Sequence, residues 1–169
     1  MAGSKRAESK GDTESSVDRE MVVTRVIDAP RAMVWEACTA PKEIVKWWGP
    51  RGFTTTIHEM NVRPGGLWKS IMRGPDGTEY LNNCVFTEAV EPERIVYNLV
   101  GGRKEDGDVH ARVSLAFEAQ GEKTKVTLRM RFATDVELER SAKKYKAAEG
   151  GNEMLDRLQE YLANGVVVY

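Results

Sequence analysis

Residues 124–132, with the sequence TKVTLRMRF, alternate more regularly than any other part of the chain. Successive side chains of a β-strand point to opposite faces. One face of this predicted strand carries Thr124, Val126, Leu128, Met130 and Phe132. The other face carries Lys125, Thr127, Arg129 and Arg131. A strand with one apolar and one charged face is typical of an antiparallel sheet covered on one side only, so the chain must supply a cover.

Six other segments have strand patterns and are separated by turns rich in Gly, Pro and Asp. The predicted strands are 21–28, 53–60, 67–73, 78–90, 94–100 and 109–119. Together with 124–132 they form a sheet large enough to curve.

Helical patterns lie at two places. Residues 31–39 and 41–48 are predicted as two short helices after the first strand, the second opened by Pro41 and stopped by Gly49 and Pro50. Apolar residues at three- and four-residue spacing predict a long helix over about 136–164. Glycines 150 and 151 predict a bend or a break within it. This helix is the predicted cover of the sheet, and a space can remain between them.

The composition excludes several classes of protein. The net charge of -1 over 169 residues gives no signal for nucleic acid, and no apolar run is long enough for a membrane span. Cys38 and Cys84 lack the spacing of a zinc site or a CxxC pair, so we expect free buried thiols. No secretory signal is evident, which predicts a cytoplasmic protein.

Domain organisation follows from the distribution of apolar residues. Residues 1–20 mix charges of both signs with Ser and Gly, and their only sizeable apolar residues are Met1 and Val17. Such a segment cannot bury enough surface to order itself. We therefore predict a disordered polar leader over 1–20 and a single domain over 21–166.

Four stretches carry a resemblance to a known family. They are IDAPRAMVWEACTAPKEIVKWWGPRGF, VRPGGLWKSIMRGPDG, FTEAVEPERIVYNL and GGNEMLDRLQEYLA. In order and spacing the chain resembles the START-like superfamily, also called SRPBCC or helix-grip. Within it, the chain is similar to the branch of the C-terminal domain of the activator of the heat-shock protein 90 ATPase. The resemblance covers about residues 21–164 and implies an α+β helix-grip fold, a curved seven-stranded antiparallel sheet around a C-terminal helix. The superfamily includes ligand carriers, enzymes and cochaperones.

Trp47 and Trp48 stand side by side immediately before Gly49 and Pro50. Adjacent residues cannot both face the core from a regular helix or strand. One interpretation is packing at a corner of the fold, and the other is a pocket wall. We predict that Trp47 faces inward and that Trp48 lies at a rim and is more exposed.

Polar candidates are few. His58 shares its parity with Thr54, Thr56 and Met60, a face that could line a cavity. In 78–90, one asparagine must point to the covered side, where its amide either finds a partner or orients a polar ligand group. No zinc-binding histidine motif and no nucleophile motif is present, so we predict neither a metal site nor a catalytic residue, and no cofactor.

The sequence favours a non-enzymatic binding module for a small hydrophobic or amphipathic ligand, held between the sheet and the last helix. The predicted ligand-binding residues are Trp35, Trp47, Trp48, His58, Trp68, Asn82, Cys84, Phe86, Met130, Met154 and Leu158. One alternative, implied by the resemblance, is a protein-interaction domain that contacts a chaperone. Another is an enzyme acting on a hydrophobic substrate. The charged outer face of 124–132 predicts a monomer or a weak dimer.

Overall fold

The computed structural model describes residues 19–100, 110–134, 139 and 147–164. In this part of the chain, seven strands form one sheet, and three helices are defined. The strands are β1 (Glu20–Ile27), β2 (Thr54–Met60), β3 (Leu67–Arg73), β4 (Glu79–Val90), β5 (Arg94–Leu99), β6 (Ala111–Gln120) and β7 (Lys123–Phe132). The helices are α2 (Arg31–Thr39), α3 (Pro41–Ile44) and α5 (Ala147–Asn164).

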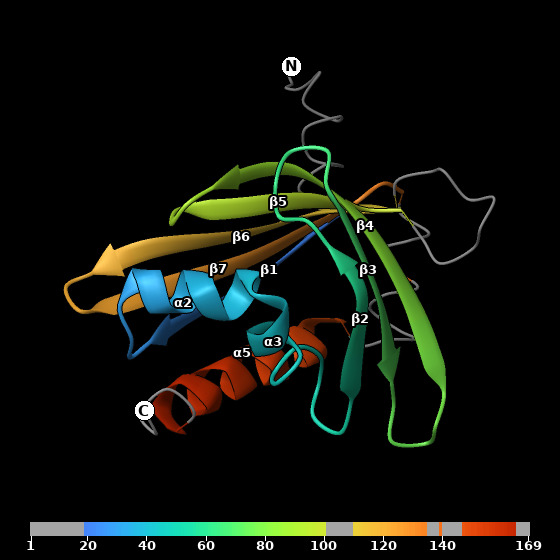
Figure 1. Cartoon of the computed structure of the whole chain (residues 1–169), viewed down its shortest axis with the longest axis horizontal. Coiled ribbons are helices and arrows are strands. Elements are labelled where there is room, and N and C mark those ends of the chain that lie inside the picture. Colours follow the sequence, from blue (N-terminus) through green and yellow to red (C-terminus); the bar gives the residue numbers. More distant parts are fainter. Residues whose placement is uncertain (1–18, 101–109, 135–138, 140–146, 165–169) are drawn as a thin grey trace, which may run out of the picture.

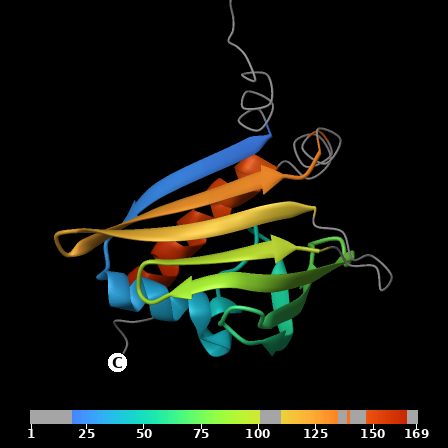
Figure 2. The same cartoon turned by 90° about the horizontal axis from the view of Figure 1, so that it is seen from above.

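The sheet is antiparallel throughout and has the strand order β1-β7-β6-β5-β4-β3-β2. Strands β2 to β6 each pair with the next strand in the chain, whereas β1 pairs with β7. The sheet curves, and all three helices lie on its concave side (Figure 1). Seen from above, α5 runs beneath β1, β7 and β6 (Figure 2). This confirms the predicted curved seven-stranded sheet around a C-terminal helix.

The alternation that predicted β7 has the expected consequence. Val126 and Leu128 are buried against the helices, whereas Arg129 and Arg131 are exposed on the convex face. Burial of each large apolar side chain contributes about 1.5–3 kcal/mol. The matching face of α5 contributes Leu155 and Leu158, both fully buried in the same core.

Two irregularities bend the sheet. The register shifts between Ile57 and Glu59 in β2 and between Phe86 and Glu88 in β4. Such bulges add local twist and bend a strand. Both strands belong in whole or in part to the half of the sheet that turns down beside the helices (Figure 1).

The structure differs from the sequence predictions in two helices. α3 ends at Ile44, so Trp47 lies in the turn that follows it and Trp48 directly after that turn. α5 continues through Gly150 and Gly151 near its start, so the helix is not broken at these glycines, against one form of the prediction. The predicted helical residues 136–146, apart from 139, lie outside the described residues, as does the leader up to residue 18. No described helix is long and apolar enough to cross a membrane.

Candidate functional site

The tryptophan pair occupies two different environments, as predicted. Trp47 is completely buried, and its Nε1 donates a hydrogen bond to the carbonyl oxygen of Ala37 at 2.9 Å. Trp48 is partly exposed, and its ring meets that of Trp68 in a T-shaped contact with centroids 5.0 Å apart. Trp47 thus fastens the turn to α2, and Trp48 reaches the space under the sheet.

That space is a cavity of about 190 Å³ between the concave face of the sheet, the 48–50 turn and the start of α5. Its lining is mostly apolar and includes residues from six strands. The lining residues are Met21, Trp48, Gly49, Pro50, Trp68, Ser70, Met72, Asn82, Cys84, Tyr97, Leu99, Val113, Leu128, Met130, Gly150, Gly151 and Met154. Four of them are methionines, whose flexible thioethers adapt to irregular ligand shapes.

The lining contains no Asp, Glu, Lys, Arg or His. Its titratable side chains are Cys84 and Tyr97. Burial raises the pKa of the Cys84 thiol to about 12 and moves the pKa of Tyr97 well above its usual value of 10.0. Both groups are therefore neutral at physiological pH, and the whole wall of the cavity is uncharged. No cluster of three or more potential metal ligands occurs in the described chain.

The structure brings six of the eleven predicted site residues together in the lining. These are Trp48, Trp68, Asn82, Cys84, Met130 and Met154. Four others are buried in the core outside the lining, namely Trp35, Trp47, Phe86 and Leu158. Phe86 lies just behind the wall, because its ring stacks on Trp68 with centroids 5.9 Å apart.

His58 is exposed and lies outside the cavity, so the inward parity predicted for it is wrong. On β2 the buried side chain is Thr55, which is out of phase with His58. His58 lies at the register shift between Ile57 and Glu59 and has no partner residue on β3. Because Thr55 is the buried residue, Thr54, Thr56 and His58 all lie on the exposed face of β2.

The sequence reasoning missed several lining residues. Ser70 has the same parity as Trp68 on β3, and Val113 and Leu128 belong to faces that were already predicted to be buried. These could have been included by extending the parity argument to the whole covered face. Tyr97 gives no such signal, because three consecutive residues of β5, Ile95 to Tyr97, are buried.

The two helix glycines let α5 approach the other walls. A Cβ atom at position 150 would lie 3.2 Å from Cγ of Pro50, and one at position 151 would lie 3.3 Å from Cδ2 of Leu128. Contacts this short would force the neighbours to move. Both glycines line the cavity, so their role is close approach of the helix rather than a break.

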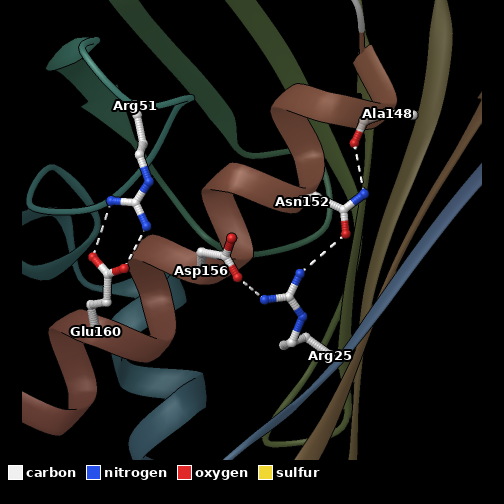
Figure 3. Close-up of polar contacts among 6 residues, drawn as sticks. All are labelled: Arg25, Arg51, Ala148, Asn152, Asp156 and Glu160. Carbon is white, nitrogen blue, oxygen red and sulfur yellow. Dashed lines mark hydrogen bonds and ion pairs between the residues drawn. The ribbon is translucent and has the colours of Figure 1, made fainter.

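Ion pairs fix α5 on both sides (Figure 3). On the strand side, Arg25 of β1 binds Asp156 and donates to Oδ1 of Asn152 at 3.1 Å. On the turn side, Arg51 binds Glu160, and its backbone N–H donates to Glu153 at 3.1 Å. The helix is thereby tied to the segment that carries Trp48.

The guanidinium group of Arg157 contacts several backbone carbonyl oxygens of the turn that follows α3. Its Nη1 donates to the carbonyl oxygens of Gly49 at 2.9 Å and Pro50 at 3.0 Å, and lies 3.4 Å from that of Trp48. Burial and the neighbouring Arg51 guanidinium lower the pKa of Arg157, yet its carbonyl partners suit a cation. Arg157 therefore holds the 48–50 wall of the cavity against α5.

We expect the Arg157→Met variant to lose about 1.5–3 kcal/mol of unfolding free energy, because hydrogen bonds to a charged group are lost and carbonyls are left unpaired. The Arg51→Met control breaks an exposed ion pair and should cost clearly less stability. Urea unfolding of both variants measures the difference. Equal, small losses would show that Arg157 does not hold the turn.

The residues that form the cavity lie almost entirely within a region that matches a known family. The family model described as activator of Hsp90 ATPase homolog 1-like protein matches residues 28–163, well over half of the chain. The chain belongs to this family. The match spans α2 through α5, including every wall of the cavity except Met21 on β1. A search of curated proteins found no match.

Several solved structures share the fold. The chain is similar to an Arthrobacter aurescens protein, with a TM-score of 0.79 and 21% identity over 90% of this chain and 88% of that one. The Mycobacterium smegmatis protein Ms6760 gives a TM-score of 0.76 at 20% identity, over 87% and 92% of the two chains. An AHSA1 protein from Silicibacter pomeroyi gives 0.71 at 19%, over 85% and 97%.

Proposed function

We propose that the protein is a binding module that holds a small, largely apolar molecule in the cavity between its sheet and α5, without converting it chemically. The observation that carries the proposal is the cavity itself, about 190 Å³ under a sheet whose other inward side chains are tightly packed. Ligand sites are typically concave and apolar with a few placed polar groups, as this lining is. The uncharged lining favours binding over proton transfer.

A variant that fills the cavity tests the proposal. Val113 lies between Tyr97 and Met130 on neighbouring strands, and all three line the cavity. Val113→Phe should place a ring in the ligand space. Ser114→Phe is the matched control, because the adjacent residue of β6 points to the convex face.

We expect toluene, phenol and 1-hexanol to include at least one ligand that stabilises the wild type. At ten times Kd, the gain is about 1.4 kcal/mol, or roughly 3–6 °C in melting temperature. Ser114→Phe should keep this shift, and Val113→Phe should lose it. The proposal fails if no compound shifts the wild type, or if Val113→Phe responds like the wild type. If the proposal passes this test, native mass spectrometry of gently purified protein would identify the natural ligand.

The family description supports a second candidate, a domain that contacts the heat-shock protein 90 chaperone. A pull-down and an ATPase assay with the chaperone from the same organism distinguish this function. Micromolar binding with a change in ATPase rate would support it, and the absence of binding in that range would remove it.

A further inference from the structure

The cavity has one polar wall. Ser70 of β3 and Asn82 of β4 are direct cross-strand partners, and both line the cavity. Directly opposed side chains on one face lie about 5 Å apart, so their polar groups can meet one ligand atom. Tyr97 adds a third polar group to the lining, from β5.

These polar groups have unused hydrogen-bonding capacity. Asn82 makes one side-chain hydrogen bond among the described residues, a long one of 3.4 Å from Nδ2 to the carbonyl oxygen of Tyr80. The Ser70 hydroxyl has no partner in the described chain, although Ser70 is only 3% exposed. Among the described residues, Nε1 of Trp68 is the one side-chain N or O atom that is both fully buried and without a hydrogen-bond partner. The Ser70 hydroxyl oxygen has no partner in this part of the chain either, so it must be accessible. The Ser70 hydroxyl therefore opens on the cavity.

The facing wall is apolar. It is formed by Met21 and the β7 residues Leu128 and Met130, together with Gly151 and Met154 of α5. A molecule that satisfies both walls has one polar end and an apolar body. The polar end must also be neutral, because the lining offers no counter-charge and an ion taken from water would lose its hydration without compensation.

The volume limits the size of this molecule. A cavity of about 150 Å³ in another protein takes up benzene. A volume of about 190 Å³ therefore suits one ring with a short substituent. It is too small for most drug-sized ligands, whose pockets span about 300–1,000 Å³.

We infer that the cavity selects a neutral molecule of single-ring size whose hydroxyl or carbonyl group hydrogen-bonds to Ser70 and Asn82. The inference rests on the proposed binding function and adds the chemical class of the ligand. Phenol, toluene and benzoate test it, because they have similar sizes and differ in the polar group.

Titration calorimetry of the wild type should show phenol binding at least about fivefold more tightly than toluene, which corresponds to one net hydrogen bond. Benzoate should not bind measurably. The Ser70→Ala and Asn82→Leu variants should each reduce the preference for phenol over toluene. Asn83→Leu is the control, since Asn83 is the next residue of β4 and lies outside the lining.

The outcomes separate the two proposals. Equal affinities for phenol and toluene in the wild type, or benzoate binding as tightly as phenol, would overturn the ligand class and leave the binding function standing. An unchanged preference in both Ser70→Ala and Asn82→Leu would overturn the role of these residues. If none of the three compounds binds, the binding function fails and the ligand class falls with it.

Discussion

Replacing Trp47 with alanine should lower the free energy of unfolding by about 3–5 kcal/mol, the usual cost of removing a fully buried large aromatic side chain. Its ring is completely buried in the main core, and its Nε1 is bonded to the Ala37 carbonyl oxygen. The variant loses the packing and also leaves that carbonyl without its donor. Urea unfolding measures the loss.

Trp48→Ala is the matched control, because the neighbouring ring is partly exposed and lines a cavity. It should cost clearly less stability than Trp47→Ala and should instead weaken ligand binding. Trp47→Phe should recover most of the packing and lose about 1 kcal/mol through the missing hydrogen bond. Equal stability losses in the two alanine variants would contradict the division between an inward and a rim tryptophan.

Stability should fall steeply above pH 9. Burial raises the pKa of Cys84 from its ordinary value of 9.0 to about 12, and it raises the pKa of Cys38 further. Between these values the unfolded chain has lost the thiol proton and the folded chain keeps it, so the folded state binds more protons. Stability is then fully present below about pH 9 and is lost as pH rises toward 12, by about 1.4 kcal/mol per pH unit for each thiol.

Urea unfolding of the wild type at pH 8 to 11 measures this slope. Cys84→Ala should have a slope that is shallower by about 1.4 kcal/mol per pH unit, whatever its stability at neutral pH. The two cysteines are free, and their thiolates oxidise readily in the unfolded chain at high pH, so both proteins are unfolded in the presence of a reducing agent. A slope that is identical in the wild type and in Cys84→Ala would show that the thiol ionises in the folded protein.

The fold could be predicted from the sequence where one pattern acts alone. The alternation of β7 fixes which face is buried, and the 3.6-residue period of the last helix supplies the cover. Two contiguous polar residues on β4 were enough to predict one inward asparagine, which is Asn82. These inferences need only the local period of a strand or helix.

The sequence was less informative where tertiary contacts decide. The outward position of His58 follows from the burial of Thr55, and which face of β2 is covered depends on the neighbouring strands and helices rather than on the local period. In the sequence, the glycines of α5 suggest a break, because the cost of glycine in a helix depends on local structure alone. Their benefit is the close approach to Pro50 and Leu128, which are distant in the sequence. The enclosure of Tyr97 depends on its ring contacts with Trp68 and Phe86, residues of two other strands.

The occupation of the cavity can be measured directly by diffraction. Crystals soaked in 4-bromophenol give an anomalous signal at the bromine position. We expect one bromine inside the cavity, near Met154 and Leu128, with the hydroxyl directed to Ser70 and Asn82. Bromine found only on the outer surface, or no bromine at all at millimolar soaking concentrations, would contradict the claim that this cavity binds small molecules.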